Sequence, residues 1–184
     1  MRPLQAIAMG VVVLLLEAPA GGFDLLADPL GWLLVLLGVR DLPRAMPLRG
    51  ALRAVSVVAA VASVPLWLPV VVEALEDADE SLAWAANLPR LGFFVVLGLG
   101  LAGAATAAGD RVAGTCWRVV AGGGLVVVLL PALVFGGGLN QLDDAAGAAV
   151  ALVPTVVVVL GFWHSGRRWA GGEPAPSPDD VSSG

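Results

Sequence analysis

Apolar residues along this chain fall into long runs separated by short polar or charged segments. A run of about 20 apolar residues can cross the hydrocarbon core of a bilayer as one helix. The pattern predicts an all-α fold, a polytopic transmembrane helix bundle over residues 1–164, with spans at about 4–20, 23–39, 54–72, 91–108, 119–135 and 148–163. Residues 165–184 are mostly Gly, Pro, Ser and charged residues, which predicts a disordered cytoplasmic tail.

The run 23–39 is the weakest candidate for a complete crossing, because Asp24 and Asp28 interrupt its beginning. Pro is favoured in the first turn of a helix, so we expect the continuous helix to start at Pro29 with Asp28 as its N-cap. A helix from Pro29 to Val39 would be about 16 Å long, which is about half of a bilayer core. The run is therefore either a short span or a re-entrant half-helix.

The arginines favour a crossing, because basic residues in short loops stay on the cytoplasmic side. With six spans and an inner N-terminus, nine of the ten arginines lie in inner segments and only Arg90 lies outside. A re-entrant second run would instead leave outside the four residues Arg40, Arg44, Arg49 and Arg53. We therefore predict that 23–39 crosses and that both termini are cytoplasmic.

The first run also has features of a signal peptide, since Arg2 precedes it and Ala18-Pro19-Ala20 follows it. A single basic residue, Glu17 near the small residues and Pro19 among them all weigh against cleavage. Whether residues 1–20 are removed stays open. In both cases the next segment starts outside, so the predicted topology is the same.

The composition supports a membrane protein, because 58% of the residues are apolar and 14% are charged. In soluble domains about 45–50% of the residues are apolar and about 25% are charged. The net charge of −5 argues against nucleic acid as a partner. The single Cys116 and single His164 give no disulfide and no cysteine- or histidine-rich metal site, and we expect no cofactor. Every basic residue is Arg, a bias typical of GC-rich bacterial genomes.

Three carboxylates surround the predicted turn between the first two spans: Glu17, Asp24 and Asp28. Converging carboxylates can bind a cation or relay a proton. The alternative is that Asp28 and Asp24 cap the helix and the turn while Glu17 faces the lipid headgroups. The sequence favours this alternative, because all three lie near the interface, where a charge costs little.

Arg90 is the one basic residue on the predicted outer side, at the start of the fourth span. A helix N-terminus already carries partial positive charge, so the cation needs compensation. We predict that Arg90 packs toward the turn between the first two spans and pairs with Glu17, Asp24 or Asp28. An equally favoured alternative is that it extends to the outer headgroups.

Small residues repeat every four positions in the fourth span, in the rows Gly98, Ala102, Thr106 and Gly100, Ala104, Ala108. This spacing places them on one helix face and lets backbones approach closely. We therefore predict helix packing through Gly98, Ala102 and Thr106. The partner is either another span or a second copy of the chain.

The stretch from Asp24 to Trp32 reads Asp-Leu-Leu-Ala-Asp-Pro-Leu-Gly-Trp. It resembles a stretch in uncharacterised small multi-pass membrane proteins of actinobacteria, in which Pro often stands at the position of Ala27. The resemblance covers roughly the first quarter of the chain. It implies a bacterial membrane protein and implies no activity.

Catalytic chemistry finds little support, because Ser56 and Ser63 have no nearby base and His164 reads as an interface residue. The sequence favours a non-enzymatic accessory or structural protein of the cell membrane, with lipid, other membrane proteins or itself as partners. The alternative is a small transporter or an ion- or proton-conducting protein that uses the acidic cluster. An intramembrane enzyme ranks third.

Overall fold

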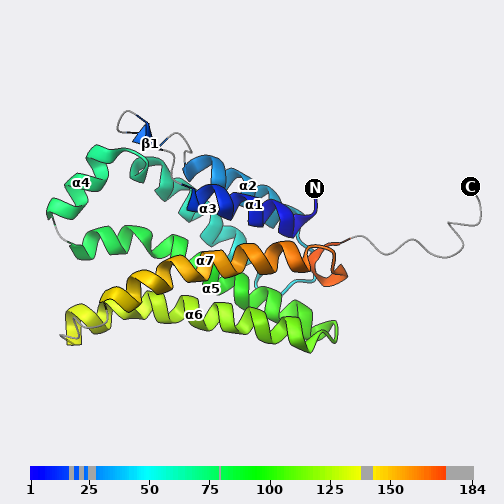
Figure 1. Ribbon diagram of the computed structural model, residues 1–184. Helices are drawn as coiled ribbons and strands as arrows, with labels where there is room; N and C mark the ends of the chain where they lie inside the picture. The colour runs from blue at the N-terminus through cyan, green and yellow to red at the C-terminus, as the bar shows by residue number, and fades with distance from the viewer. Residues whose placement is uncertain (17–18, 21–22, 25–27, 79, 138–142, 173–184) are drawn as a thin grey trace, which may run out of the picture.

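The computed structural model describes residues 1–16, 19–20, 23–24, 28–78, 80–137 and 143–172 (Figure 1). The all-α prediction is confirmed for these residues, apart from the two-residue antiparallel strands β1 (Pro19–Ala20) and β2 (Phe23–Asp24). The helices are α1 (Pro3–Leu15), α2 (Asp28–Asp41), α3 (Arg49–Leu66), α4 (Pro69–Ala78), α5 (Glu80–Ala107), α6 (Arg111–Gly137) and α7 (Asp143–His164), followed by the 3-10 turn η2 (Arg168–Ala170).

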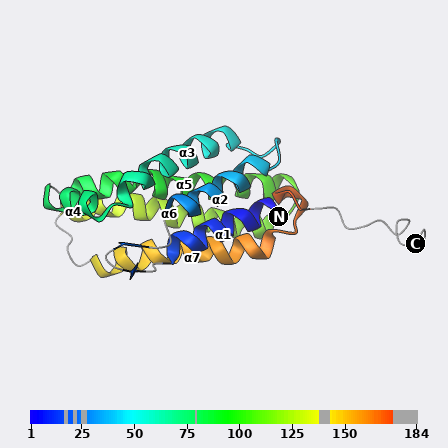
Figure 2. The ribbon, with the colours of Figure 1, turned by 90° about the horizontal axis from the view of Figure 1, so that it is seen from above.

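The long helices lie along one common axis, and the chain reverses direction between one and the next (Figures 1 and 2). The N-terminus, the link between α2 and α3, the turn between α5 and α6, and the end of α7 lie at the same end of the bundle. We call it the arginine end, because these segments carry Arg2, Arg40, Arg44, Arg49, Arg53, Arg111, Arg118, Arg167 and Arg168. The strand pair and α4 lie at the opposite end.

Helices α1 and α2 pack as a close antiparallel pair because glycines lie where they touch. A Cβ added to Gly10 would lie 2.5 Å from the carbonyl oxygen of Gly31. One added to Gly38 would lie 2.6 Å from the carbonyl oxygen of Pro3 and 2.9 Å from the backbone nitrogen of Ile7. Any side chain at Gly10 or Gly38 would therefore push backbone away from backbone.

The row Gly98, Ala102 and Thr106 of α5 lies against α6. A Cβ on Gly98 would come within 2.9 Å of the backbone of Trp117 and Ala121. Ala102 is buried, and the hydroxyl of Thr106 donates to its carbonyl oxygen at 2.7 Å. The partner of this row in the structure is therefore a neighbouring helix of the same chain.

The second row of α5 has a different neighbour. A Cβ on Gly100 would lie 2.5 Å from the terminal methyl group of Met46 and 2.9 Å from the carbonyl oxygen of Pro47. Met46 and Pro47 belong to the α2–α3 link, residues 42–48, so this row faces a loop. Both rows of small residues therefore make close contacts, but the first row faces helix α6 and the second faces the α2–α3 link.

The core joins all of the long helices through apolar side chains. Trp32 of α2 packs edge-on against Phe93 of α5 with ring centroids 5.2 Å apart, and Phe93 packs against Phe94 at 5.3 Å. Helix α7 contacts α1 where a Cβ on Gly161 would lie 3.0 Å from that of Ala8. The interior of the described bundle is therefore closed by aromatic rings and by small residues at helix crossings.

The expected span 54–72 is not one helix, and this part of the prediction is wrong. The chain turns at Trp67 and Leu68, between α3 and α4. Pro69 has no N–H to continue the α3 hydrogen-bond ladder, and it disfavours helical geometry at the residue before it. Pro69 is therefore the first residue of a new helix, whereas Pro65 lies within α3.

Helix ends also differ from the apolar runs. Helix α1 ends at Leu15, before the expected limit at residue 20, and residues 19–20 form β1. Helix α2 begins at Asp28, next to the expected start at Pro29. The later helices extend beyond their runs, since polar residues can continue a helix outside an apolar layer. The tail beyond Gly172 lies outside the described residues.

Three described segments are long and apolar enough to cross a membrane: Arg49–Leu66, Trp84–Ala107 and Arg111–Leu129. Pro3–Leu15 and Ala151–His164 are apolar but shorter. These lengths support a membrane protein.

The glycine contact between α1 and α2 predicts that Gly10→Ala destabilises the protein. Because the new methyl group would meet backbone, we expect a loss of about 1–3 kcal/mol. Gly122→Ala is the matched control, since a Cβ there meets nothing within 4 Å and Ala favours a helix. Thermal unfolding in detergent measures both variants, and an equal response would contradict the close packing.

Candidate functional site

A cavity of about 170 Å³ lies between α2, α3, α4 and α5, toward the end opposite the arginine end. We call it the Arg90 pocket. Its polar lining residues are Asp28, Ser63, Asn87 and Arg90, and its apolar ones are Trp32, Ala59, Ala62, Leu66, Val72, Leu75, Ala86 and Pro89. Two of the four residues in the cluster predicted from sequence, Asp28 and Arg90, therefore line one cavity.

Local structure explains how the polar residues reach the pocket. Asp28 is the first residue of α2, directly before Pro29. The carboxylate thus lies at a helix N-terminus, where negative charge is stabilised. Ser63 is buried, and its hydroxyl donates to the carbonyl oxygen of Ala60 at 2.8 Å. Asp28 and Asn87 each make an interaction of their own.

The guanidinium of Arg90 reaches across the bundle to the end of α1. Its Nη2 donates to the carbonyl oxygen of Leu14 at 3.1 Å. The last carbonyls of a helix lack partners within the helix and carry partial negative charge, so they attract a cation. Arg90 therefore joins α5 to α1 beside the turn that the sequence indicated.

The carboxylate partner expected for Arg90 stays a prediction. Glu17 and the side chain of Asp24 lie outside the described residues. Asp28 lines the same cavity as Arg90. The structure thus brings Arg90 near one of the three acidic residues and ties it to a helix carbonyl.

The base of the Arg90 pocket is aromatic. Trp32, 1% exposed, lines the cavity and packs on Phe93, which is fully buried. Farther along α3, Ser56 is buried and donates to the carbonyl oxygen of Leu52 within its own helix at 2.7 Å. In the described part of the chain the pocket therefore lies near one end of the bundle, and buried apolar side chains pack next to it.

A second polar cluster closes the arginine end. Asp110, between α5 and α6, accepts a hydrogen bond from the N–H of Ala113 at 3.1 Å. Its other oxygen accepts from the indole of Trp169 at 3.3 Å and lies 3.8 Å from Nε of Arg167. Asp110 therefore caps α6 and holds the segment after α7 against it.

These contacts change the acidity of Asp110. The Ala113 N–H holds the pKa of the Asp110 carboxyl below its usual range, burial opposes this shift, and Trp169 and Arg167 add to the lowering. The carboxylate form is thus the one that the folded structure stabilises.

His164 was read as an interface residue, but it is 5% exposed. Its Nδ1 lies 3.1 Å from the carbonyl oxygen of Leu160, and its ring lies between Trp117 and Trp169, with centroid distances of 6.1 and 5.6 Å. Its role in the structure is packing at the arginine end.

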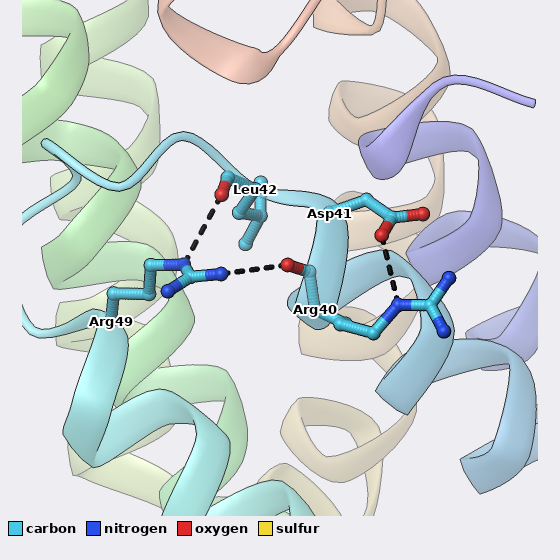
Figure 3. A network of polar contacts seen from close by, with 4 residues as sticks. All are labelled: Arg40, Asp41, Leu42 and Arg49. Carbon is cyan, nitrogen blue, oxygen red and sulfur yellow. Dashed lines mark hydrogen bonds and ion pairs between the residues drawn. The ribbon is translucent and has the colours of Figure 1, made fainter.

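Sequence reasoning also missed how Arg49 holds the α2–α3 link (Figure 3). The Arg49 guanidinium donates from Nε to the carbonyl oxygen of Leu42 at 3.1 Å and from Nη2 to that of Arg40 at 2.7 Å. The side chain of Arg40 points away from Arg49, and its Nε lies 3.0 Å from Oδ1 of Asp41. A basic residue shortly after a helix was visible in the sequence, but its carbonyl partners were not.

Among the described residues, no three His, Cys, Asp or Glu side chains gather as a metal site requires. Comparison with known proteins finds no matching family model, no matching curated protein and no matching solved structure.

The Arg90 contact predicts that Arg90→Gln lowers stability by about 1 kcal/mol, because a charge-assisted hydrogen bond is lost. Arg53→Gln, at an exposed position of α3, is the control. Combining Arg90→Gln with Glu17→Gln, Asp24→Asn or Asp28→Asn then tests the ion pair. Coupling of at least about 0.5 kcal/mol in one cycle supports pairing, and additivity in all three excludes it.

The Asp110 cap predicts that Asp110→Ala costs about 1 kcal/mol. Asp110→Asn keeps a capping oxygen and loses the charge, so it should cost less. Folding lowers the pKa of Asp110, so its charge stabilises the folded state at pH values above the unfolded pKa of about 4. This stabilisation is lost as the pH falls through the folded pKa.

Thermal unfolding at several pH values should therefore show wild type and Asp110→Asn converging below about pH 4. Asp41→Asn is the control, because the pair of Asp41 with Arg40 is exposed and contributes little. A gap for Asp110→Asn that stays constant with pH would contradict the role of its charge.

Proposed function

We propose that the protein is a non-enzymatic accessory or structural component of the bacterial cell membrane, with six spans and cytoplasmic termini. The alternating direction of α1, α2, α3, α5, α6 and α7 supports this topology. So does the gathering of nine arginines at the end where the N-terminus lies, since basic segments stay in the cytoplasm.

The short helices α1 and α2 fit this topology only with help from their neighbours. With 13 and 14 residues they are each about 20 Å long, against about 30 Å for a bilayer core. Non-helical backbone at membrane depth is tolerated where protein covers it. Packing of α1 against both α2 and α7 supplies part of that cover.

The apolar packing beneath the Arg90 pocket is the observation that favours an accessory role over transport. A substrate path needs polar side chains or a cavity at mid-bundle. In the described residues, apolar packing follows directly after the polar lining: Trp32 lies one turn along α2 from Asp28, and the buried Phe93 and Phe94 lie about one turn along α5 from Arg90. Ser56 of α3 is buried and donates to a carbonyl of its own helix. The partners of such a protein are lipids, other membrane helices or a second copy.

The alternative function is a small transporter or an ion- or proton-conducting protein. The Arg90 pocket favours it, because Asp28, Asn87 and Arg90 meet there beside Ser63. The acidic cluster would then supply the first binding step from the outer side.

Reporter fusions test the topology. Fusions after Met46 and Gly184 should report the cytoplasm, and a fusion after Asp77 should report the outside, because the arginine end sets the orientation. A fusion after Met46 that reports the outside would remove the crossing by 23–39 and with it the six-span arrangement.

Proteoliposomes with a pH-sensitive dye inside separate the two functions. The accessory role predicts proton flux equal to that of protein-free vesicles under an applied potential. Flux that Asp28→Asn abolishes and Asp41→Asn leaves unchanged would instead establish conduction through the Arg90 pocket.

A further inference from the structure

A second cavity of about 450 Å³ lies at the arginine end. We call it the basal groove. It is bounded by the α2–α3 link, the end of α5 and the η2 turn, through residues that include Pro43, Pro47, Ala104, Ala108, Arg168 and Trp169. All of these except Arg168 are apolar or aromatic, so the groove offers an apolar wall with a cation beside it.

The segments that form the wall of the groove are held in place by contacts with the rest of the bundle. The link is held against α5 where Gly100 leaves room for Met46 and Pro47, and Arg49 bonds the backbone of the link. On the other side of the groove Gly171 has a left-handed backbone with φ +84°, and a Cβ added there would lie 2.9 Å from Cγ of Pro3. The turn that carries Arg168 is thus packed onto α1.

Trp169 completes this side of the groove. Its indole nitrogen donates to Asp110 at 3.3 Å while its ring lines the cavity. Tryptophan with one polar and one apolar side is typical of a membrane–water interface. Arg168 and Trp169 therefore sit on an anchored element, and little ordering is needed for a ligand to bind there.

The charge around the groove is strongly positive. Nine arginines lie in the segments of this end, and the acidic residues described there are Asp41 and Asp110, which pair with Arg40 and Arg167. The exposed Arg44 of the link and Arg168 of η2 have no carboxylate within ion-pair distance among the described residues. An anionic group with an apolar chain attached complements this surface.

We propose that the basal groove binds an anionic phospholipid, with the headgroup phosphate at Arg168 and the start of one acyl chain against the Pro and Ala wall. Basic pockets at the cytoplasmic ends of membrane helices bind anionic headgroups in this way. The inference rests on membrane insertion as proposed above, but it does not depend on the number of spans or on transport.

Purified full-length protein in a neutral detergent provides the test. It is titrated with phosphatidylglycerol or with phosphatidylcholine of the same acyl chains, and native mass spectrometry measures the bound lipid. We expect preference for phosphatidylglycerol, and Arg168→Gln should weaken its binding about fivefold, which corresponds to about 1 kcal/mol per basic residue near a membrane surface.

Two further variants make the result specific. Ala107→Trp, at an exposed position that lines the groove, should weaken binding of phosphatidylglycerol by filling the apolar wall. Arg53→Gln removes one charge from the same end without lining the groove, and it should bind like wild type. Unfolding temperatures in lipid-free detergent show that each variant is folded.

Several outcomes would overturn the proposal. Equal binding of the two lipids would remove the role of headgroup charge, and equal loss in Arg168→Gln and Arg53→Gln would mean diffuse attraction. If phosphatidylglycerol bound only after deletion of residues 173–184, the occupant of the groove would be this acidic tail rather than lipid. Since the assay uses solubilised protein, a wrong topology would leave its result unchanged and would appear in the reporter fusions alone.

Discussion

Close approach of backbones at glycines is the constraint on which the rest of this bundle depends. Apolar helices in a bilayer gain little from burying more apolar surface, since lipid tails are equally apolar, so they associate where backbones can touch. The α1–α2 pair does this at Gly10 and Gly38, α5 and α6 at Gly98, and α1 and α7 at Gly161. These contacts set the distance between helices, and the aromatic rings of Trp32 and Phe93 then fill the space that remains.

Polar contacts near the ends of the bundle join elements that the glycine contacts do not join. Arg90 bonds the last turn of α1, and Arg49 bonds one carbonyl at the end of α2 and one just after it. Asp110 caps α6 and accepts a hydrogen bond from Trp169. The bonds of Arg90, Arg49 and Asp110 to backbone groups lie at or just beyond helix ends, where such groups lack partners within the helix. Both cavities lie beside such a junction, since Arg90 lines one and Trp169 lines the other.

The sequence predicted features that depend on neighbouring residues along the chain, and it did not predict contacts between distant segments. The long apolar runs predicted helices within α5, α6 and α7, and the Asp28-Pro29 pair located the start of α2 to within one residue. The break before Pro69 depended on whether neighbouring groups would accept a kink, and the pairing of Asp110 with Trp169 joins segments far apart in the chain. Arg90 is instructive in this respect. Its position before an apolar run indicated that it needs a partner with negative charge, but the carbonyl oxygen of Leu14 at the end of α1 could not be named from the sequence.

Exclusive use of arginine connects the topology to the architecture. A lysine can orient a span, but its ammonium group is a single compact charge. The planar guanidinium of Arg49 bonds the carbonyl oxygens of Arg40 in α2 and of Leu42 in the link, and it remains charged because arginine keeps its proton in proteins. One residue thus closes the end of α2 and adds to the positive end of the bundle. The carbonyls that it binds cannot neutralise it, and the same holds for Arg90. A bundle that closes its helix ends in this way retains its positive charge at that end, which is the charge on which the proposed orientation in a membrane depends.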